Sequence, residues 1–353
     1  MYVAWRDLRF ARGRFALIGA VVALITLLVG FLSGLTGGLA AQNVSAVLAL
    51  PGDRLVLKPV GAGAATFADS SIDADTISAW RTAPGVDRVA PIGIQQTRAE
   101  GPAGTGAVAL LGLDADGTFP APARAGDVVL STGAAKTLGA GIGDTVVVAG
   151  STFTVSAVGD DLSYSHTPVA SLTLDAWRTL DERLGGSGEP TVLAVAGSPT
   201  WDAVAAETGT VASAPLASLA ALPTFRSEIG SLALMIAMLF GVSALVVGAF
   251  FTVWTMQRAG DVAVLKALGA STAALVRDAL GQALVVLTVG VGVGIGLTAA
   301  LGSLAGGALP FVLSPLTTLA PAVVMIALGL IGAAVSLRTV TASDPLTALG
   351  STR

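Results

Sequence analysis

The sequence contains no cysteine and only one histidine among its 353 residues. The absence of cysteine excludes disulfide bonds, so any folded domain in this chain must be held together by its own hydrophobic core. Charged residues are also scarce, at 12% of the chain, whereas apolar residues make up 53% and the mean hydropathy is +0.80. These values lie outside the range of ordinary soluble domains and indicate a membrane protein.

The sequence also lacks the motifs that bind nucleotides or carry out hydrolysis. The nearest phosphate-binding pattern has Ala135 before Lys136, where a P-loop requires glycine. The alternating glycines from Gly290 to Gly296 lie inside an apolar segment, where close helix packing explains them better than a dinucleotide site. No nucleophile elbow or catalytic triad is visible. We therefore expect a protein that is not an enzyme, has no catalytic cofactor, binds no nucleic acid and, if ATP drives its action, relies on another protein to bind the ATP.

Four long apolar segments predict membrane-spanning helices. The second, Ile229 to Trp254, has no charge over 26 residues, which gives about 39 Å of helix against a hydrocarbon core of about 30 Å. The others are Ala16 to Leu32, Ala279 to Leu301 and Leu316 to Leu337. A basic start before Ala16 is also typical of a signal peptide, but this apolar run is longer than the usual one. We therefore expect it to remain as a helix.

Basic residues gather on one side of these four segments. They precede the first segment, connect the second to the third and follow the fourth: Arg6, Arg9, Arg12, Arg14, Arg258, Lys266, Arg277 and Arg338. By the positive-inside rule, that side is the cytoplasm. We expect a multi-pass protein of the plasma membrane with both termini inside the cell and the long segment between the first two spans outside.

The segment from Asn43 to Glu228 differs in composition from the rest of the chain. It carries ten Lys and Arg against nineteen Asp and Glu, and its 186 residues are enough for a core of its own. Short apolar runs bounded by Gly, Asp and Pro predict strands at Arg54–Lys58, Ala107–Leu113, Asp127–Leu130, Thr145–Val148, Phe153–Val158, Val169–Leu174 and Thr191–Ala196. Helical patterns intervene at Ala74–Thr82, Ser131–Leu138 and Leu174–Leu184. The predicted fold is four transmembrane α-helices with a large α+β extracytoplasmic domain inserted between the first and second.

These patterns set the expected domain boundaries. An amphipathic cytoplasmic helix covers 1–14, the transmembrane helices cover 15–42, 227–255, 273–301 and 316–338, and the extracellular domain covers 43–226. A second amphipathic cytoplasmic helix covers 256–272, an extracellular loop covers 302–315 and a cytoplasmic tail covers 339–353.

The polar segment Gln257 to Ala270 connects the second and third spans. Val262, Leu265 and Leu268 form an apolar stripe on its predicted helix. The other faces carry Arg258, Asp261 and Lys266. Gly269 is a natural terminator of this helix. The pattern predicts an amphipathic helix that lies on the membrane surface or against a partner protein.

Glu228 places an ionisable group where the second span begins on the outer side. At 100° per residue, Met235 lies about 20° from Glu228 and Met238 about 80°, so one helix face carries a carboxylate and two thioethers, with Ser231 beside them. Such a group at a membrane boundary indicates a functional site. An acidic residue that complements the dipole in a first helical turn, with methionines that only pack, explains the same pattern. Arg226 either pairs with an anionic substrate group or extends to the interface.

His166 follows Asp160 and Asp161 and shares a segment with Tyr164. An imidazole in such a setting is either a metal or haem ligand or a solvent-exposed loop residue. A single imidazole without a second histidine or a cysteine forms a weak metal site, which favours the exposed loop.

The arrangement resembles the ABC transporter permeases of the MacB and FtsX type, in which one span precedes a large extracytoplasmic domain and three spans follow. The resemblance covers the whole chain. It is carried by the coupling segment Gln257 to Ser271, the sequence Asp344 to Leu349 after the last span, the amino-terminal Ala4 to Arg9, and the outer-domain run Val129 to Val146. Asp261 and Val262 stand where the family usually has Glu and Ile, which keeps charge and shape.

The resemblance implies a homodimer that binds two copies of a separate cytoplasmic ABC ATPase. The ATPase-coupling residues would be Arg258, Asp261, Val262, Leu265, Lys266, Leu268 and Gly269. Closure of the ATPases would move the coupling helices, and the first two spans would relay this motion outward by mechanotransmission. The absence of charged residues from the spans agrees with rigid levers rather than a water-filled pore.

Within the family, the chain looks most similar to haem-export permeases of Gram-positive bacteria. This implies a substrate that enters from membrane lipid, with haem iron at Glu228 as the only metal. The predicted substrate-binding residues are Glu228, Ser231, Met235, Arg226, Phe31 and Met238, with Phe225 as a further aromatic wall. Export of antimicrobial peptides or lipids is an alternative. Another is an FtsX-like signalling scaffold that controls an extracellular cell-wall hydrolase, which should expose an apolar partner patch.

Overall fold

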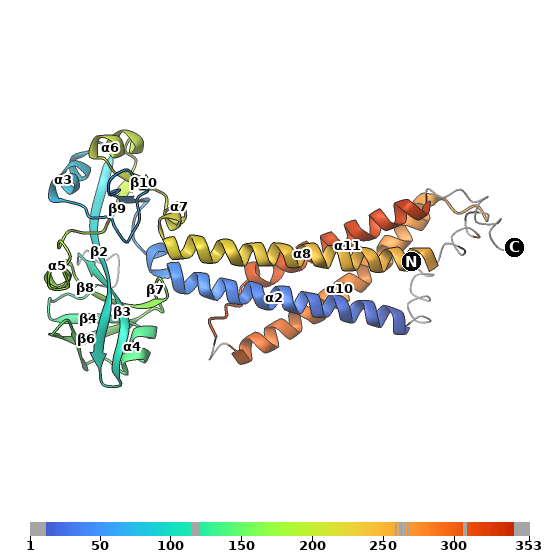
Figure 1. The fold of residues 1–353 in the computed structure, drawn as a ribbon, viewed down its shortest axis with the longest axis horizontal. Helices are drawn as coiled ribbons and strands as arrows, with labels where there is room; N and C mark the ends of the chain where they lie inside the picture. Colours follow the sequence, from blue (N-terminus) through green and yellow to red (C-terminus); the bar gives the residue numbers. More distant parts are fainter. Residues whose placement is uncertain are drawn as a thin grey trace. The chain divides into compact units, whose positions relative to one another are not determined.

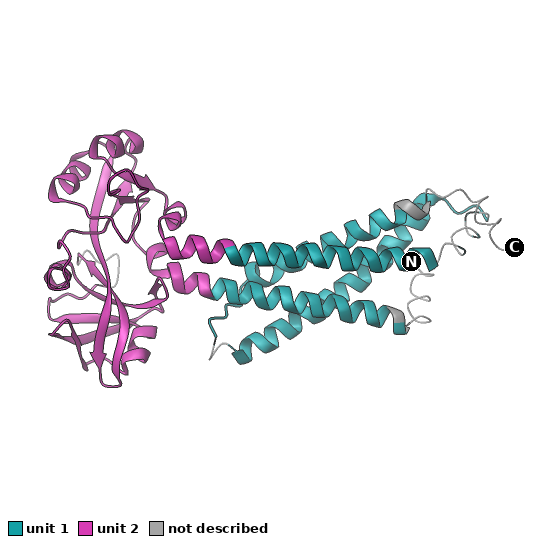
Figure 2. Ribbon diagram, in the orientation of Figure 1, with its two compact units in different colours: residues 1–38, 231–353 teal, residues 39–230 magenta. Residues whose placement is uncertain are grey.

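The computed structural model describes residues 12–114, 121–257, 260, 264, 266, 268–305 and 309–341. The chain forms two compact units, one of residues 1–38 with 231–353 and the other of residues 39–230 (Figure 2). The second unit is an insertion in the first. We call them the helical unit and the outer unit.

Four long helices are apolar enough to cross a membrane within the described part of the chain. They are α2 (Arg12–Leu48), α8 (Pro223–Gln257), α10 (Thr272–Ala305) and α11 (Pro315–Thr341) (Figure 1). This confirms the predicted fold class. Helix α2 continues well past the apolar run that ends at Leu32, because small and helix-compatible residues follow until Pro51. Its last turns, like the first turns of α8, belong to the outer unit.

Glycines bring α10 against α2 inside the helical unit. A Cβ atom added at Gly290 would lie 2.9 Å from Val22, and one added at Gly294 would lie 2.6 Å from Thr26. The alternate glycines, Gly292 and Gly296, have no atom within 4 Å of such a Cβ. Close helix packing therefore accounts for the glycines that are spaced by four, as the sequence predicts.

Helices α8 and α11 meet at a second pair of glycines in the helical unit. A Cβ atom added at Gly332 would lie 3.2 Å from the Cα of Gly248. One turn further along, the hydroxyls of Thr252 and Ser336 are 2.8 Å apart, and Ser336 also donates to the carbonyl of Gly248. In lipid, where apolar burial does not drive helices together, such close contacts and small hydrogen-bonded side chains hold the pair.

The outer unit is built on one large mixed sheet. Its strands are β1 (Arg54–Leu57), β2 (Val86–Gly101), β3 (Gly104–Leu113), β4 (Asp127–Ser131), β5 (Thr145–Val148), β6 (Ser151–Gly159), β7 (Ser163–Tyr164), β8 (Thr167–Thr173), β9 (Val192–Gly197) and β10 (Val211–Ser213). The order is β10-β1-β9-β2-β3-β8-β4-β6-β5, and β5 also pairs with β2. The pairing of β5 with β2 closes six strands, in the order β2-β3-β8-β4-β6-β5, into a small barrel.

Strand β2 joins two lobes of the outer unit. Its first half pairs with β9, in the lobe that contains β1 and β10, and its second half pairs with β3 and β5 in the barrel. Large apolar side chains fill each lobe: Trp177 is 1% exposed beside the barrel, and Trp80 is fully buried in the other lobe. The predicted strands agree closely with the observed ones. Strand β2 is missed because Pro91, Gly93 and several polar residues interrupt its alternation.

Short helices cover the two lobes. They are α3 (Ala74–Thr82), α4 (Thr132–Leu138), α5 (Leu174–Arg183), α6 (Trp201–Thr208) and α7 (Pro215–Ser218), and α7 is followed by a 3-10 turn (Leu219–Ala221). The sequence predicts α3, α4 and α5, but not α6 or α7. Neither missed helix has a side-chain hydrogen bond at its N-cap, whereas α3, α4 and α5 each have one.

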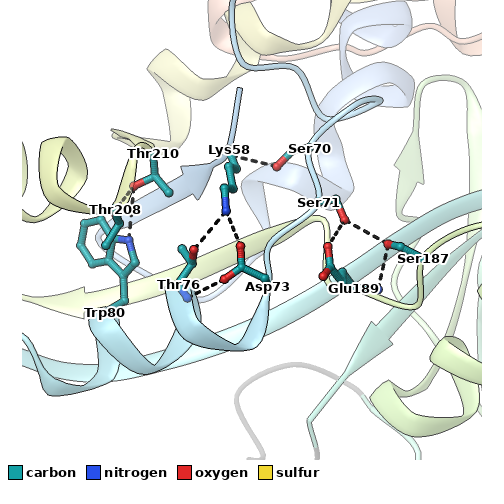
Figure 3. A network of polar contacts seen from close by, with 10 residues as sticks. All are labelled: Lys58, Ser70, Ser71, Asp73, Thr76, Trp80, Ser187, Glu189, Thr208 and Thr210. Carbon is teal, nitrogen blue, oxygen red and sulfur yellow. Dashed lines mark hydrogen bonds and ion pairs between the residues drawn. The ribbon is translucent and has the colours of Figure 1, made fainter. Parts of the chain in front are cut away.

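A polar network fixes the start of α3 (Figure 3). Asp73 is the N-cap and accepts a hydrogen bond of 2.8 Å from the backbone N–H of Thr76. Lys58, at the end of β1, pairs with the same carboxylate and also donates to the Thr76 hydroxyl at 3.3 Å. The hydrogen bond from Lys58, followed by the one from Thr76, holds the pKa of Asp73 well below its usual range. This network ties α3 to the sheet.

Candidate functional site

Three polar side chains from separate elements meet inside the outer unit. Asn43 comes from the last turns of α2, His166 from the tip of the β7–β8 hairpin and Glu228 from the first turns of α8. The Nε2 of His166 lies 2.8 Å from the Oε2 of Glu228, and the Nδ2 of Asn43 donates to the same oxygen at 3.2 Å. The Asn43 Nδ2 and His166 Nε2 atoms are 3.4 Å apart. We call these three residues the junction cluster.

The hairpin that carries His166 is fastened to the end of α2. The backbone N–H groups of Ser165 and His166 donate to the carbonyls of Asn43 and Gln42, each at 3.0 Å. Ser165 and His166 have φ values of 45° and 64°, in the left-handed region that favours glycine or asparagine. The two backbone bonds hold this costly turn, so the imidazole is fixed against Glu228 rather than free in a loop.

A buried tyrosine anchors the same hairpin on its other side. Tyr164 is 6% exposed, and its ring lies edge-on to Phe67 at 6.4 Å within the core under the hairpin. Tyrosine is protonated at neutral pH, and burial raises the pKa of Tyr164 further above its usual range, so the phenol is not an anionic ligand. Its role here is to position the turn.

The junction cluster combines a buried amide with two groups that solvent reaches. The side chains of Glu228 and His166 are 24% and 32% exposed, whereas Asn43 is fully buried. The Oδ1 atom of Asn43 is buried and accepts no hydrogen bond from any described residue. The arrangement can therefore present a carboxylate and an imidazole to a ligand while Asn43 holds the carboxylate from behind.

The structure corrects two expectations about this site. Glu228 is the sixth residue of α8, which begins at Pro223, and the first turn of α8 has no acidic residue. A helix dipole therefore does not explain Glu228. His166 is not only an exposed loop residue, because it contacts Glu228. Asn43 has no sequence signal, since its partners are 123 and 185 residues away.

The other predicted substrate residues divide between the two units. In the outer unit, Arg226 is exposed, and Phe225 packs against the hydrophobic core instead of offering an open aromatic wall. In the helical unit, Ser231 is exposed, and Met235 and Met238 are 49% and 65% exposed. Those three face away from the helical unit's own core.

Phe31 packs inside the helical unit. Its ring centroid lies 5.1 Å from that of Phe311, which belongs to the predicted outer loop. The Phe311 ring fills the space where Gly34 and Gly302 have no side chains. Part of the predicted Phe31 surface is therefore already covered by the chain itself.

Three of the predicted coupling residues lie within the described part of the chain. Gly269 has a φ of 92°, in the left-handed region that is common where helices end, and its N–H donates to the carbonyl of Lys266 at 3.0 Å. Leu268 is 79% exposed and Val264 is 60% exposed, so apolar side chains face outward here. The structure does not describe the other predicted coupling residues, which are Arg258, Asp261, Val262 and Leu265. Residues 1–11 of the predicted amino-terminal helix and the segment Asp344–Leu349 also lie outside the described residues.

An apolar groove of about 370 Å³ runs between α2 and α10 in the helical unit. Its walls include Phe15, Gly19, Val289 and Gly290. The groove has almost no polar surface, so it offers no hydrogen bond or charge to orient a ligand. We do not include it in the candidate site.

Two family descriptions match the chain in sequence. Residues 17–211 match the MacB-like periplasmic core domain, and residues 233–345 match the FtsX-like permease C-terminal domain. Together they cover both units.

Full-length relatives are similar at low identity. The putative hemin transport system permease protein HrtB of Staphylococcus haemolyticus is 25% identical over 379 residues, and an uncharacterized ABC transporter permease of Mycobacterium bovis is 25% identical over 370 residues. Each alignment covers 99% of both chains. Among solved structures, the periplasmic region of MacB from Actinobacillus actinomycetemcomitans aligns with 48% of this chain and 92% of its own at a TM-score of 0.36 and 12% identity.

Permeases of this kind are multi-pass membrane subunits that work with an ABC ATPase, and they are generally not catalytic themselves. Most of the chain falls within the two matched domains, and the order of one span, an outer domain and three further spans is theirs as well. The chain therefore belongs to the MacB and FtsX family of ABC transporter permeases.

Proposed function

We propose that this chain is the permease subunit of an efflux pump that extrudes an amphipathic substrate, with haem as the first candidate. The observation that carries the proposal is the pairing of Glu228 with His166 at the outer start of α8. A carboxylate and an imidazole, both partly exposed, are groups that bind iron and other Lewis acids. Similarity to a putative hemin transport permease supports the same substrate.

Haem makes three demands, which His166 and the predicted residues near it would meet. Its iron takes an oxygen or nitrogen ligand, its ring needs apolar contact, and its propionates need a cation. Glu228 and His166 supply the ligand atoms, and the exposed Arg226 offers a guanidinium to a propionate. Met235 and Met238 remain predicted ring contacts on the basis of helix periodicity and the adaptable packing of thioethers.

Transport in this proposal uses motion that a separate ATPase generates. Two ATPase copies would bind the coupling segments of a homodimer at the cytoplasmic face, and both termini of the chain would lie on that side. Helices α2 and α8 contain 37 and 35 residues without interruption, which gives each of them more than about 50 Å. Continuous helices of that length can transmit displacement along their axes, and a substrate would leave the lipid without passing through a pore.

A haemin titration tests the proposal. We expect the purified full-length chain in lipid nanodiscs to bind haemin with a Soret shift, and Glu228→Gln to weaken that binding at least about tenfold because it removes an anionic ligand. His166→Ala should weaken binding and alter the Soret maximum. The matched control is Glu207→Gln on α6, which should leave both the affinity and the spectrum unchanged.

The same experiment separates haem from the alternatives. An unchanged affinity and Soret spectrum in Glu228→Gln would remove the junction cluster from haem binding. Absence of specific haemin binding in the wild-type chain would overturn the haem assignment and leave export of peptides or lipids, or control of a cell-wall hydrolase.

A further inference from the structure

We propose that Asn43, His166 and Glu228 form a binding site for one first-row divalent cation, of which Zn²⁺ is the representative. The three donors come from three elements that are far apart in the sequence, and they converge within the outer unit. Their atoms are separated by 2.8 Å (His166 to Glu228), 3.2 Å (Asn43 to Glu228) and 3.4 Å (Asn43 to His166). This triangle is the size of one face of a metal coordination polyhedron.

The size argument follows from metal–ligand distances. Zinc lies about 2.0–2.2 Å from imidazole nitrogen and carboxylate oxygen, so neighbouring ligands in octahedral or tetrahedral geometry lie about 2.8–3.6 Å apart. All three observed separations fall in that interval. A single ion above the triangle is therefore within reach of Nε2 of His166, Oε2 of Glu228 and the Asn43 amide, where Oδ1 must take the place of Nδ2 because an amide nitrogen is not a metal ligand.

One atom of the cluster is left without a hydrogen bond. When its Nε2 is protonated, His166 donates to Glu228, and the Asn43 amide donates to the same oxygen, so the 3.4 Å contact between the two nitrogens joins two donors. The buried Oδ1 of Asn43 accepts nothing from the described residues. A half-turn of the amide brings Oδ1 to face the two other side chains, and with a lone pair on Nε2 of His166 all three atoms can then be ligands of one ion.

The surroundings suit an ion that enters from outside. Glu228 and His166 are partly exposed, whereas Asn43 is fully buried and its neighbours hold the hairpin through backbone hydrogen bonds. Ligands are thus preorganised on one side and open to water on the other. With one imidazole, one carboxylate and one amide oxygen, the set suits Zn²⁺ and its first-row neighbours better than Ca²⁺, which takes six to eight oxygen ligands.

The cation would also regulate the proposed substrate site. This part rests on the proposed function, because Glu228 serves both the cation and the haem iron there. One carboxylate oxygen held by a divalent ion is not available to haem. Zn²⁺ should therefore compete with haemin, and the outer cation concentration would set how readily the pump accepts its substrate.

Zinc binding to the full-length chain tests the site without haem. His166 is the only histidine and the chain has no cysteine, so a protein freed of its affinity tag offers few competing zinc ligands. Titration calorimetry of chelator-treated protein with Zn²⁺ should give one ion per chain, and His166→Ala and Glu228→Gln should each weaken binding at least about tenfold. Co²⁺ in place of Zn²⁺ should give a visible absorption band that the same variants lose.

Asn43→Asp distinguishes coordination from a hydrogen-bonded cluster. A second carboxylate should tighten Zn²⁺ binding severalfold, whereas in a cluster held by hydrogen bonds it would only repel Glu228. Gln42→Ala is the matched control, because it keeps the backbone carbonyl that holds His166 and should leave zinc affinity unchanged. Thermal unfolding of each variant checks that the outer unit is intact.

Two results would overturn the cation site: no Zn²⁺ binding by the folded wild-type chain, or binding by His166→Ala and Glu228→Gln as tight as that of wild type. Neither result bears on the haem proposal, because haemin is absent from this titration and Zn²⁺ is absent from the haemin titration. Competition between haemin and Zn²⁺ is measured last. If the two ligands do not compete, only the regulatory part of the proposal is contradicted.

Discussion

The helical unit and the outer unit are held together by different kinds of contact. In the helical unit, helices approach through glycines such as Gly290, Gly294 and Gly332, whose missing side chains let backbones touch. In the outer unit, large side chains such as Trp80 and Trp177 fill the space between sheet and helices. Lipid gives apolar burial no advantage, so the first unit relies on close fit, whereas water drives the second to bury area.

The comparison predicts that added volume at the glycines between helices damages the helical unit. Gly294→Leu should prevent α10 from packing on α2, since even a Cβ there would lie 2.6 Å from Thr26. Overpacking costs about 1–3 kcal/mol, and more where backbone blocks relaxation, so we expect loss of the monodisperse protein. Size-exclusion chromatography in detergent measures the effect.

Gly292→Leu is the control for this prediction, because it lies on the same helix and has open space around it. The variant should behave as wild type. Equal damage from both substitutions would show that helix propensity, and not contact with α2, decides the outcome.

Removed volume should damage the outer unit instead. Trp177 lies between Gly93 and Gly112, whose added Cβ atoms would be 2.2 Å and 2.4 Å from it. Trp177→Ala leaves a cavity that those glycines do not fill, and we expect a loss of about 3–5 kcal/mol of unfolding free energy. Denaturant unfolding of the full-length chain measures it. A loss below about 1 kcal/mol would contradict the packing described for the barrel.

The smallest predicted effect concerns the polar network of the outer unit. Asp73→Ala removes the α3 cap and the Lys58 ion pair, and the lost cap alone should cost about 1 kcal/mol. Because the folded state lowers the pKa of Asp73, this stabilisation is present above the ordinary carboxyl value of about 4 and is lost as pH falls below it.

Asp73→Asn tests the pH dependence, because asparagine can keep the cap without the charge. Wild type should lose stability relative to Asp73→Asn when unfolding is measured from pH 6 down to pH 3. A constant difference between the two proteins across this interval would exclude the ion pair as its source.

The sequence predicts most of the architecture, because the signals that define it are local. Uncharged runs mark the spans, and alternating residues mark most strands of the outer unit. Strand β2 escapes prediction because it serves two lobes: it pairs with β9 up to Ile92 and with β3 from Gly93 onward. Its pairing with β5, which closes the barrel, depends on contacts far apart in the chain.

The candidate site is only half predictable for the same reason. Glu228 stands out as a carboxylate at the edge of an apolar run. Asn43 resembles any polar residue after a span, and His166 resembles a loop histidine. Their meeting depends on the hairpin turn at Ser165 and on the length of α2, which extends as far as Leu48. Neither feature is visible in local composition.

ATP-driven haemin export in proteoliposomes tests the central claim most directly. The full-length chain and its partner ATPase are reconstituted together, and movement of haemin from the bilayer to an external haem-binding protein is followed after ATP is added. We predict ATP-dependent transfer by wild type, and loss of transfer by Glu228→Gln with ATP hydrolysis retained. Equal transfer by both proteins, or none by wild type while ATP is hydrolysed, would contradict the account.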